Sequence, residues 1–418
     1  MRMDAVVAGV GMTRFGKHPD RGLKDLGAEA VSAAVADAGL ELGDLQAAYV
    51  GNCAAGTVTG QESIRGQVIL HPLGIGRIPV VNVENACASG STAFHLAAAM
   101  VTAGMYDTAL ALGVEKLTHP DKRVSFAAFA GAVDVEEVRA LLDQLATPPG
   151  GGGAPGEEAA GKGGAGGGAG EKRSMFMDIY AHAARNHMAR YGTTVEQLAA
   201  VAAKNSLHGS LNPRAQFREV LTVDDVLAAP MIVPPLTRPM CSPIGDGAAA
   251  LVVTSAARAR ELGIRRPVRV ATSVLRSGWD HGPDEPGTVE LCAREAFEEA
   301  GLGPGDLDVA EVHDASAPAE IITYEQLGLC GRGEGGALAE RGDTRLGGRL
   351  PVNTSGGLLR KGHPVGASGV AQIVELTEQL RGTSGERQVE GARVGLAQNG
   401  GGKKGNDAAA MCVTVLRS

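Results

Sequence analysis

Short apolar runs and longer amphipathic stretches alternate along the first part of the chain. Apolar runs predict strands at residues 4–11, 47–51 and 107–114. An amphipathic helix is predicted at residues 23–40, where apolar side chains recur on one face, and a short helix at residues 61–70. Strands and helices that alternate at this spacing are typical of parallel βαβ units. The pattern therefore favours an α/β fold.

This alternation stops at residue 118 and does not resume until about residue 240. Within the gap, residues 150–170 contain twelve glycines among twenty-one residues. Such a composition cannot bury enough apolar surface to become ordered, so we expect disorder at about residues 148–172. An amphipathic helix follows at residues 175–191. We expect this inserted region to cover a site.

The second half of the chain repeats a short pattern from the first. Cys87-Ala88-Ser89-Gly90 and Gly366-Ala367-Ser368-Gly369 each precede an apolar helix, and Asn85 and Asn353 lie before them. This similarity suggests two homologous halves related by a pseudo-dyad. Only the first copy contains a cysteine. Further strands are predicted at residues 248–253, 268–274, 309–312, 393–397 and 409–416.

The stretch around Cys87 contains the strongest candidate for chemistry. Its β-branched residues, 80–83, predict a buried strand that turns sharply into a helix with Cys87 in its first turn. Backbone N–H groups and the helix dipole at that position favour a thiolate, which is the nucleophilic form of cysteine. We therefore expect Cys87 to be a nucleophile.

Composition and charge exclude several other classes of protein. The 418 residues are 44% hydrophobic and include 61 glycines but only 3% aromatic residues, which suits a two-domain α/β enzyme. A net charge of −8 without a basic stretch gives no sign of nucleic-acid binding. We find no membrane-length apolar run and no signal-peptide pattern, so we expect a soluble cytoplasmic protein. The six cysteines form no C-x-x-C pair, which argues against a metal site and a disulfide scaffold.

The second half offers partners for Cys87. His363, in a Gly-His-Pro turn before the second repeat, could take the thiol proton. His313 follows a predicted strand, where parallel sheets hold functional groups. Gln398 precedes three glycines, beginning with Gly400, whose N–H groups can approach a ligand. Arg360-Lys361 could contact phosphates, although such a pair is usually only solvated.

Several ordered motifs make the chain resemble the thiolase superfamily, and within it the sterol-carrier-protein or lipid-transfer thiolases and their bacterial and archaeal acetyltransferase-like relatives. The resemblance extends from about residue 4 to about residue 416. The matching motifs are Asn85-Ala86-Cys87-Ala88-Ser89-Gly90-Ser91, Ala111-Leu112-Gly113-Val114-Glu115-Lys116, Asp246-Gly247-Ala248-Ala249-Ala250, His313-Asp314-Ala315, and Asn353-Thr354-Ser355-Gly356-Gly357 with Gly362-His363-Pro364-Val365-Gly366-Ala367.

This resemblance implies a five-layered αβαβα fold of two similar halves with an inserted loop domain. The corresponding domains here are residues 1–117 with 241–265, the loop domain 118–240, and residues 266–418. It also implies a homodimer that uses coenzyme A thioesters, holds no permanently bound cofactor or metal, and works with a small partner containing an OB-fold and a zinc ribbon.

The resemblance also assigns roles to individual residues. It makes Cys87 the acyl acceptor, His363 its activating base, and His313 and His363 the groups that hold the thioester oxygen of the second substrate. The N–H groups of Cys87 and Gly400 would form the oxyanion hole. We count Asn353 as a further candidate active-site residue.

The chain differs from the family in the residue that removes a proton from the attacking carbon in the second chemical step. Most thiolases use a second cysteine there, and the two positions where it is expected hold Gln398 and Ala315. Cys53, in an early turn, is a candidate substitute. Without a strong base, an electron-rich aromatic ring or a β-dicarbonyl compound is a more suitable acceptor than acetyl-CoA.

We therefore expect an acyltransferase that forms a thioester on Cys87 and passes the acyl group to a carbon nucleophile, or cleaves a β-ketoacyl thioester. One alternative is C-acylation of an aromatic or polyketide acceptor. Another is a retro-aldolase acting on a CoA-linked side chain, although such relatives tend to lack the cysteine. The least favoured alternative is a non-catalytic scaffold subunit.

Overall fold

The computed structural model describes residues 3–146, 173–264, 266–282 and 284–418. The stretch predicted to be disordered, residues 148–172, lies outside these ranges. The strands are β1 (Ala5–Met12), β2 (Ala47–Gly51), β3 (Val80–Val83), β4 (Thr108–Glu115), β5 (Met231–Val233), β6 (Leu236–Thr237), β7 (Gly247–Ser255), β8 (Val268–Ser277), β9 (Val309–Glu311), β10 (Val394–Gly401) and β11 (Ala410–Arg417). The helices are α1 (Leu23–Asp37), α2 (Ala55–Thr59), α3 (Arg65–Leu70), α4 (Ser89–Thr102), α5 (Lys122–Ala127), α6 (Val138–Ala146), α7 (Met175–Tyr191), α8 (Val195–Ser210), α9 (Val223–Ala228), α10 (Ala256–Glu261), α11 (Thr288–Ala300), α12 (Ala317–Gln326), α13 (Gly335–Glu340), α14 (Gly357–Lys361) and α15 (Val365–Arg381).

One nine-stranded sheet extends through the described part of the molecule in the order β3-β2-β4-β7-β1-β8-β11-β10-β9. β2 is parallel to β3 and β4, and β10 is parallel to β9, but the other neighbouring strands are antiparallel. The predicted parallel βαβ units are thus present at β2, β3 and β4 and at β9 and β10, within a sheet that is mixed. The link from β10 to β11 is too short for a crossover helix, so these strands must be antiparallel.

The two halves of the sheet repeat the same order and the same strand directions. From its edge inward, the first half reads β3-β2-β4-β7-β1, and the second reads β9-β10-β11-β8. The missing fifth strand of the second half is represented by Val352, which forms a parallel bridge with Ala310 of β9, as β3 does with β2. This repetition supports the predicted pseudo-dyad.

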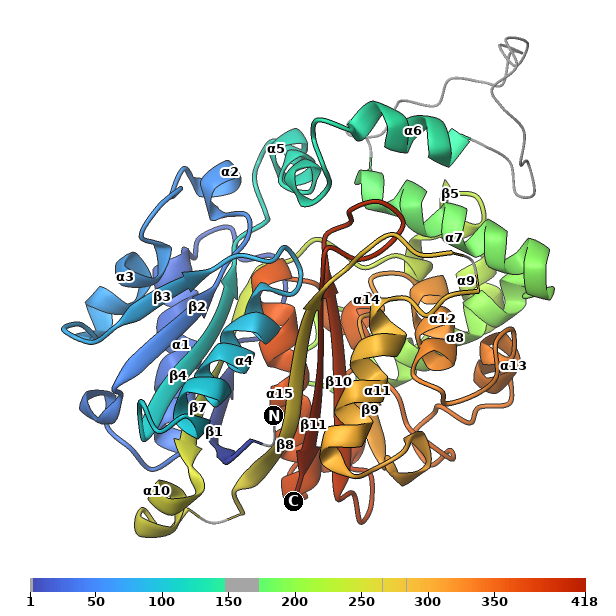
Figure 1. Ribbon diagram of the computed structural model, residues 1–418. Helices are drawn as coiled ribbons and strands as arrows, with labels where there is room; N and C mark the ends of the chain where they lie inside the picture. The colour runs from blue at the N-terminus through green and yellow to red at the C-terminus, as the bar shows by residue number, and fades with distance from the viewer. Residues whose placement is uncertain (1–2, 147–172, 265, 283) are drawn as a thin grey trace.

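Helices form three layers around the two halves of the sheet (Figure 1). α1 covers the outer face of β1 and β7, α11 covers the outer face of β8 and β11, and α4 and α15 pack together in between. Along β4, Leu110 and Leu112 face the outer core beside α1, whereas Ala109 and Ala111 face the central core. Helices thus cover both faces of the central strands, which gives the expected five-layered αβαβα thiolase fold.

The repeated Ala-Ser-Gly pattern marks the crossing of the two central helices. A Cβ atom on Gly90 of α4 would lie 2.5 Å from the carbonyl oxygen of Gly366. A Cβ atom on Gly369 of α15 would lie 2.6 Å from the backbone nitrogen of Ser91. Both distances are too short for a real contact, so each helix needs glycine here to approach the other.

The region inserted between β4 and β7 contains helices α5 to α9 and lies along the upper part of the molecule in Figure 1. Helix α7 has the predicted bounds, and α8 begins with the capping box of Thr194 and Gln197. None of the helices in the described ranges combines the length and apolar character needed to cross a membrane.

Candidate active site

Cys87 lies in a tight turn between strand β3 and helix α4. Ala86, directly before it, has a φ of 48°, a left-handed conformation that is unfavourable for a residue with a Cβ atom. Helix α4 begins only at Ser89, so Cys87 precedes the helix and is not in its first turn. The predicted strand before this turn is present as β3, but its predicted burial is wrong. β3 forms an edge of the sheet, and Val81 is 40% exposed.

The surroundings of Cys87 favour the thiol over the thiolate. Burial, together with the nearby Glu115 carboxylate, raises the pKa of the Cys87 thiol to about 12. The N–H groups of Gly402 and of Cys87 itself hydrogen-bond the sulfur and lower this pKa only in part. The predicted stabilisation of a thiolate is therefore wrong, since desolvation outweighs the N–H groups at this turn. The sulfur needs a neighbouring base.

Glu115 joins two of the segments that surround this sulfur. Its carboxylate accepts hydrogen bonds from the backbone N–H groups of Cys53 (3.0 Å), Ala54 (3.1 Å) and Gly366 (3.0 Å) and from the side chain of Asn52 (2.9 Å). Burial raises the pKa of Glu115 to about 7. The carboxylate thus holds the start of α15 against the loop after β2.

Two neutral histidines lie beside the thiol. The Cys87 sulfur and one nitrogen each from His313 and His363 all lie within 4.8 Å of one another. The two rings meet edge to face with centroids 5.2 Å apart. Burial lowers the pKa of His313 to about 4 and holds that of His363 well below its usual range. Both imidazoles are therefore uncharged at neutral pH.

Hydrogen bonding assigns the tautomer of His363. Its Nδ1 lies 2.7 Å from the hydroxyl oxygen of Ser368, and that hydroxyl donates to the carbonyl oxygen of Pro364 at 3.0 Å. Because the hydroxyl hydrogen is directed at Pro364, we assign the ring proton to Nδ1. The Nε2 lone pair of His363 is then free to accept the proton of Cys87.

His313 is hydrogen-bonded to the side-chain amide of Asn399. The amide nitrogen lies 2.9 Å from Nδ1 of His313. At its other end, the Asn399 oxygen lies 2.8 Å from the Ser91 hydroxyl, which also lies 2.9 Å from the carbonyl oxygen of Ala88. The single Ser91 hydrogen serves one of these two acceptors, so this contact does not fix the direction of the Asn399 amide. Asn399 therefore orients the His313 ring, and His363 is the histidine whose hydrogen bonds identify it as the base.

Gln398 and Asn353 contact the backbone beside His313. The Gln398 side-chain oxygen accepts the backbone N–H of His313 at 2.9 Å. Asn353, which has a φ of 57°, accepts the backbone N–H of Val312 at 2.8 Å and donates to Glu320 at 2.8 Å. Both side chains are buried and hold the end of β9 in position.

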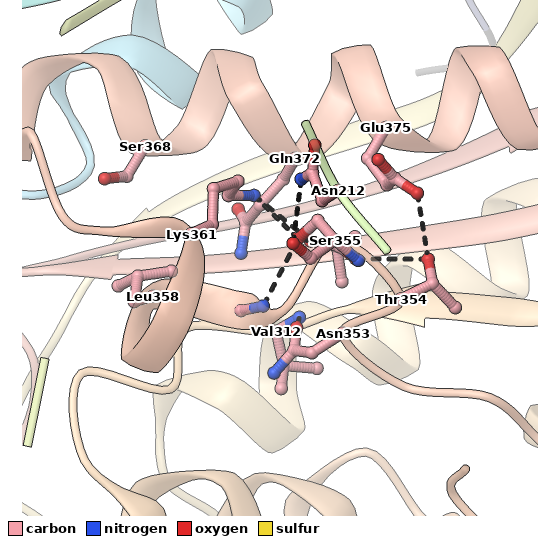
Figure 2. A network of polar contacts seen from close by, with 12 residues as sticks. Asn212, Val312, Asn353, Thr354, Ser355, Leu358, Lys361, Ser368, Gln372 and Glu375 are labelled. Carbon is pink, nitrogen blue, oxygen red and sulfur yellow. Dashed lines mark hydrogen bonds and ion pairs between the residues drawn. The ribbon is translucent and has the colours of Figure 1, made fainter. Parts of the chain in front are cut away.

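A buried polar network supports the turn that carries His363 (Figure 2). Lys361 donates to the Ser355 hydroxyl at 2.9 Å and forms a 3.3 Å ion pair with Glu311. Lys361 is thus neither solvated nor available for phosphate. The neighbouring Arg360 is buried as well and pairs with Glu219 at 3.1 Å.

Two further predicted residues lie close to Cys87. Gly402 donates its N–H to the Cys87 sulfur, and Gly400 lies two residues earlier in β10, opposite Met411 of β11. The role of the Gly400 N–H in an oxyanion hole stays a prediction. Cys53 belongs to the same apolar cluster as Cys87, and burial raises the pKa of its thiol.

A cavity of about 650 Å³ opens onto Cys87 and His363. It lies between the sheet ends and the inserted region, and its walls are mostly apolar. Three of its exposed cations are Lys17, Lys122 and Arg238. The lining also includes Thr118, His119, Phe126, Phe129, Phe176, Met177, Tyr180, Phe217, Ile232, Cys241, Ile244, Ala315 and Leu359.

Cys87, His313 and His363 form the cluster with metal-ligating geometry found among the described residues. The lone pairs that would hold a metal are the same ones that this arrangement offers for proton transfer. The prediction that no metal is needed therefore stays a prediction.

Sequence reasoning missed the residues that orient the histidines. Asn399 lies directly after Gln398, and Ser368 is the serine of the second Ala-Ser-Gly repeat. The repeat signals a helix start, but contacts between residues far apart in the chain, such as Ser91 with Asn399, leave no local signal.

Comparisons with known proteins identify the family of this chain. Residues 5–148 match the family "Thiolase, N-terminal domain", and residues 287–414 match "Thiolase C-terminal domain-like". An acetyl-CoA acetyltransferase of Methanothermobacter thermautotrophicus is 40% identical over 97% of this chain and 98% of its own length. Human sterol carrier protein 2 is 35% identical over 94% of this chain and 69% of its own length.

Two further relatives extend the range of reactions. The benzoylsuccinyl-CoA thiolase subunit BbsB of Thauera aromatica is 36% identical over 92% of this chain and 91% of its own length. The solved structure titled "Ltp2-ChsH2(DUF35) aldolase" has a TM-score of 0.76 and 26% identity, and covers 99% of this chain and 98% of that chain. The chain therefore belongs to the thiolase superfamily of acyltransferases, in its sterol-carrier-protein or lipid-transfer type.

Proposed function

We propose that this chain transfers an acyl group from a coenzyme A thioester to a carbon nucleophile through a thioester on Cys87. One observation carries the proposal: the Cys87 thiol lies within 4.8 Å of two neutral histidines, and the hydrogen bonds of His363 leave its Nε2 lone pair free. A buried thiol with a high pKa needs a base, and His363 supplies a lone pair beside it.

In the first half-reaction, Nε2 of His363 takes the Cys87 proton as the sulfur attacks the thioester carbonyl carbon. The negative oxygen that develops is held by the N–H groups of Cys87 and Gly402. The intermediate then collapses, the carbon–sulfur bond to coenzyme A breaks, and His363 returns the proton to the departing thiolate. The product is an acyl-enzyme with free coenzyme A.

In the second half-reaction, the acceptor carbon forms a bond to the acyl carbonyl carbon, and the bond from that carbon to the Cys87 sulfur breaks. The proton that the acceptor carbon loses passes through Nε2 of His363 to the Cys87 thiolate. As the family resemblance implies, His313 helps to hold the carbonyl oxygen of the second substrate. Gln398 is engaged with His313 and Ala315 has no titratable group, so neither can remove a proton from that substrate. An acceptor that is already easily deprotonated or electron-rich fits this site. In reverse, the same steps cleave a β-ketoacyl thioester.

The cavity suits a coenzyme A thioester that enters past Lys17, Lys122 and Arg238, whose charges complement its phosphates. The related aldolase structure is titled as a complex with a DUF35 protein. We propose a small OB-fold and zinc-ribbon partner for this chain as well, because neither element is found in its described residues.

A retro-aldolase is the second candidate, and the same structural relative favours it, since it is titled an aldolase. Retro-aldol cleavage of a CoA-linked side chain needs a base but no covalent acyl-enzyme. The presence of Cys87 beside His363 is therefore the observation that favours acyl transfer.

Isotope exchange tests the proposal without knowledge of the acceptor. Incubated with acetyl-CoA and labelled coenzyme A, the wild-type protein should produce labelled acetyl-CoA, because the acyl-enzyme forms reversibly. Cys87→Ala should abolish the exchange, and Cys241→Ala, which alters another cavity-lining cysteine, should preserve it. Exchange by Cys87→Ala at the wild-type rate would contradict the proposal.

A further inference from the structure

Phenylalanine is scarce in this chain, and its distribution is uneven. There are seven phenylalanines among 418 residues. Three are packed in the core, and all four others line the cavity above Cys87. The core residues are Phe15, Phe94 and Phe297, and the cavity residues are Phe126, Phe129, Phe176 and Phe217.

The cavity rings extend from the surface down to the reacting sulfur. Phe217 is 38% exposed, and Phe129 belongs to the apolar cluster that includes Cys87. On helix α7, which also lines the cavity, the rings of Phe176 and Tyr180 are 6.4 Å apart and tilted by 43°. The phenol of Tyr180 is close enough to Cys87 for a charge on the sulfur to disfavour its ionisation.

These rings lie at the cavity with their apolar faces and edges only partly covered. A second ring placed among them would gain edge-to-face and offset contacts in addition to the burial of apolar surface. A straight chain would gain only the burial. An acetyl group has no ring and would gain only the burial of one methyl group.

We propose that the acyl group carried by Cys87 bears an aromatic ring, so that the preferred donors are aryl-acyl thioesters of the phenylacetyl or benzoyl class. This inference rests on the proposed acyl transfer and specifies its substrate. The wall formed by Phe126, Phe129, Phe176 and Tyr180 selects the ring, and Cys87 holds the carbonyl carbon beside His363.

Rates of Cys87 acylation by three thioesters test this inference. Phenylacetyl-CoA and octanoyl-CoA have the same number of acyl carbon atoms, and acetyl-CoA lacks both ring and chain. Intact-protein mass spectrometry should give a second-order rate constant about tenfold higher for phenylacetyl-CoA than for octanoyl-CoA. It should be about 100-fold higher than for acetyl-CoA.

Substitutions identify the origin of this preference. Phe126→Leu and Phe176→Leu keep an apolar wall but remove a ring, and each should reduce the phenylacetyl-to-octanoyl ratio severalfold. Trp279→Leu is the matched control, because Trp279 is 84% exposed and lies outside the cavity, and it should leave the ratio unchanged.

Two negative results have different meanings. Equal rate constants for phenylacetyl-CoA and octanoyl-CoA on the wild-type protein would overturn the aromatic preference alone. Failure of all three thioesters to label Cys87 would overturn the proposed acyl transfer and this inference with it.

Discussion

At the scale of single residues, the site depends on the protonation states of three side chains. Burial makes Cys87 a neutral thiol and both histidines neutral imidazoles; the hydrogen bond from His363 to the Ser368 hydroxyl sets the tautomer of His363, and the Asn399 amide holds the ring of His313. The sequence motifs predicted Cys87, His313 and His363. They did not predict the raised pKa of Cys87, because desolvation depends on side chains that fold around the sulfur from both halves of the chain.

The protonation states of Cys87 and His363 predict how the reactivity of Cys87 depends on pH. Because the pKa of His363 is lowered, the base is already neutral at pH 7, so the rate of Cys87 alkylation by iodoacetamide should not rise from neutral to mildly alkaline pH. Ionisation of Glu115, whose pKa is about 7, adds a negative charge near the sulfur and can only lower the rate in this range. The rate should also fall in acid, where His363 gains a proton. In His363→Gln only the thiolate reacts, and its fraction rises about tenfold per pH unit below a pKa of about 12.

At pH 7 the His363→Gln variant should react about 10²-fold to 10⁴-fold more slowly than the wild type. Peptide mapping restricts the measurement to Cys87 and excludes the other cysteines. A wild-type rate that also rose about tenfold per pH unit would show that His363 is not the base.

At the scale of elements, the bounds of α7, the start of α1 and the existence of the main strands could be predicted from apolar periodicity, whereas α1 ends at Asp37 and not at residue 40. Strand direction could not, since periodicity records which faces are buried and not which neighbour a strand pairs with. The burial of β3 was also predicted wrongly, because a β-branched run is found in central and edge strands alike. The repeated Ala-Ser-Gly did predict the paired helices.

The crossing of α4 and α15 makes a prediction about stability. In Gly90→Ala the new Cβ atom would lie 2.5 Å from the Gly366 carbonyl oxygen, so the free energy of unfolding should fall by about 1–3 kcal/mol. Urea denaturation measures this change. Gly43→Ala is the control, because no atom lies within 4 Å of its added Cβ, and its stability should change by less than about 1 kcal/mol. Equal stability of Gly90→Ala and the wild type would show that the helices do not cross this closely.

At the scale of the whole molecule, the homodimer implied by the family resemblance makes a prediction about β3. This strand forms a sheet edge, and Val81 on it is 40% exposed. An exposed apolar edge is a natural place for a second chain to pair. Sedimentation should give a mass of about twice 42.5 kDa for the wild type. Val81→Lys should shift it towards the monomer, whereas a monomeric wild type would contradict the dimer.

The central claim is that acyl transfer passes through Cys87, and it has a direct measurement. After a brief incubation with a CoA thioester, intact-protein mass spectrometry should find one added acyl group, and peptide mapping should assign it to Cys87. Free coenzyme A should remove it, and Cys87→Ala should never acquire it. An unmodified wild-type protein, or the same adduct on Cys87→Ala, would contradict the account.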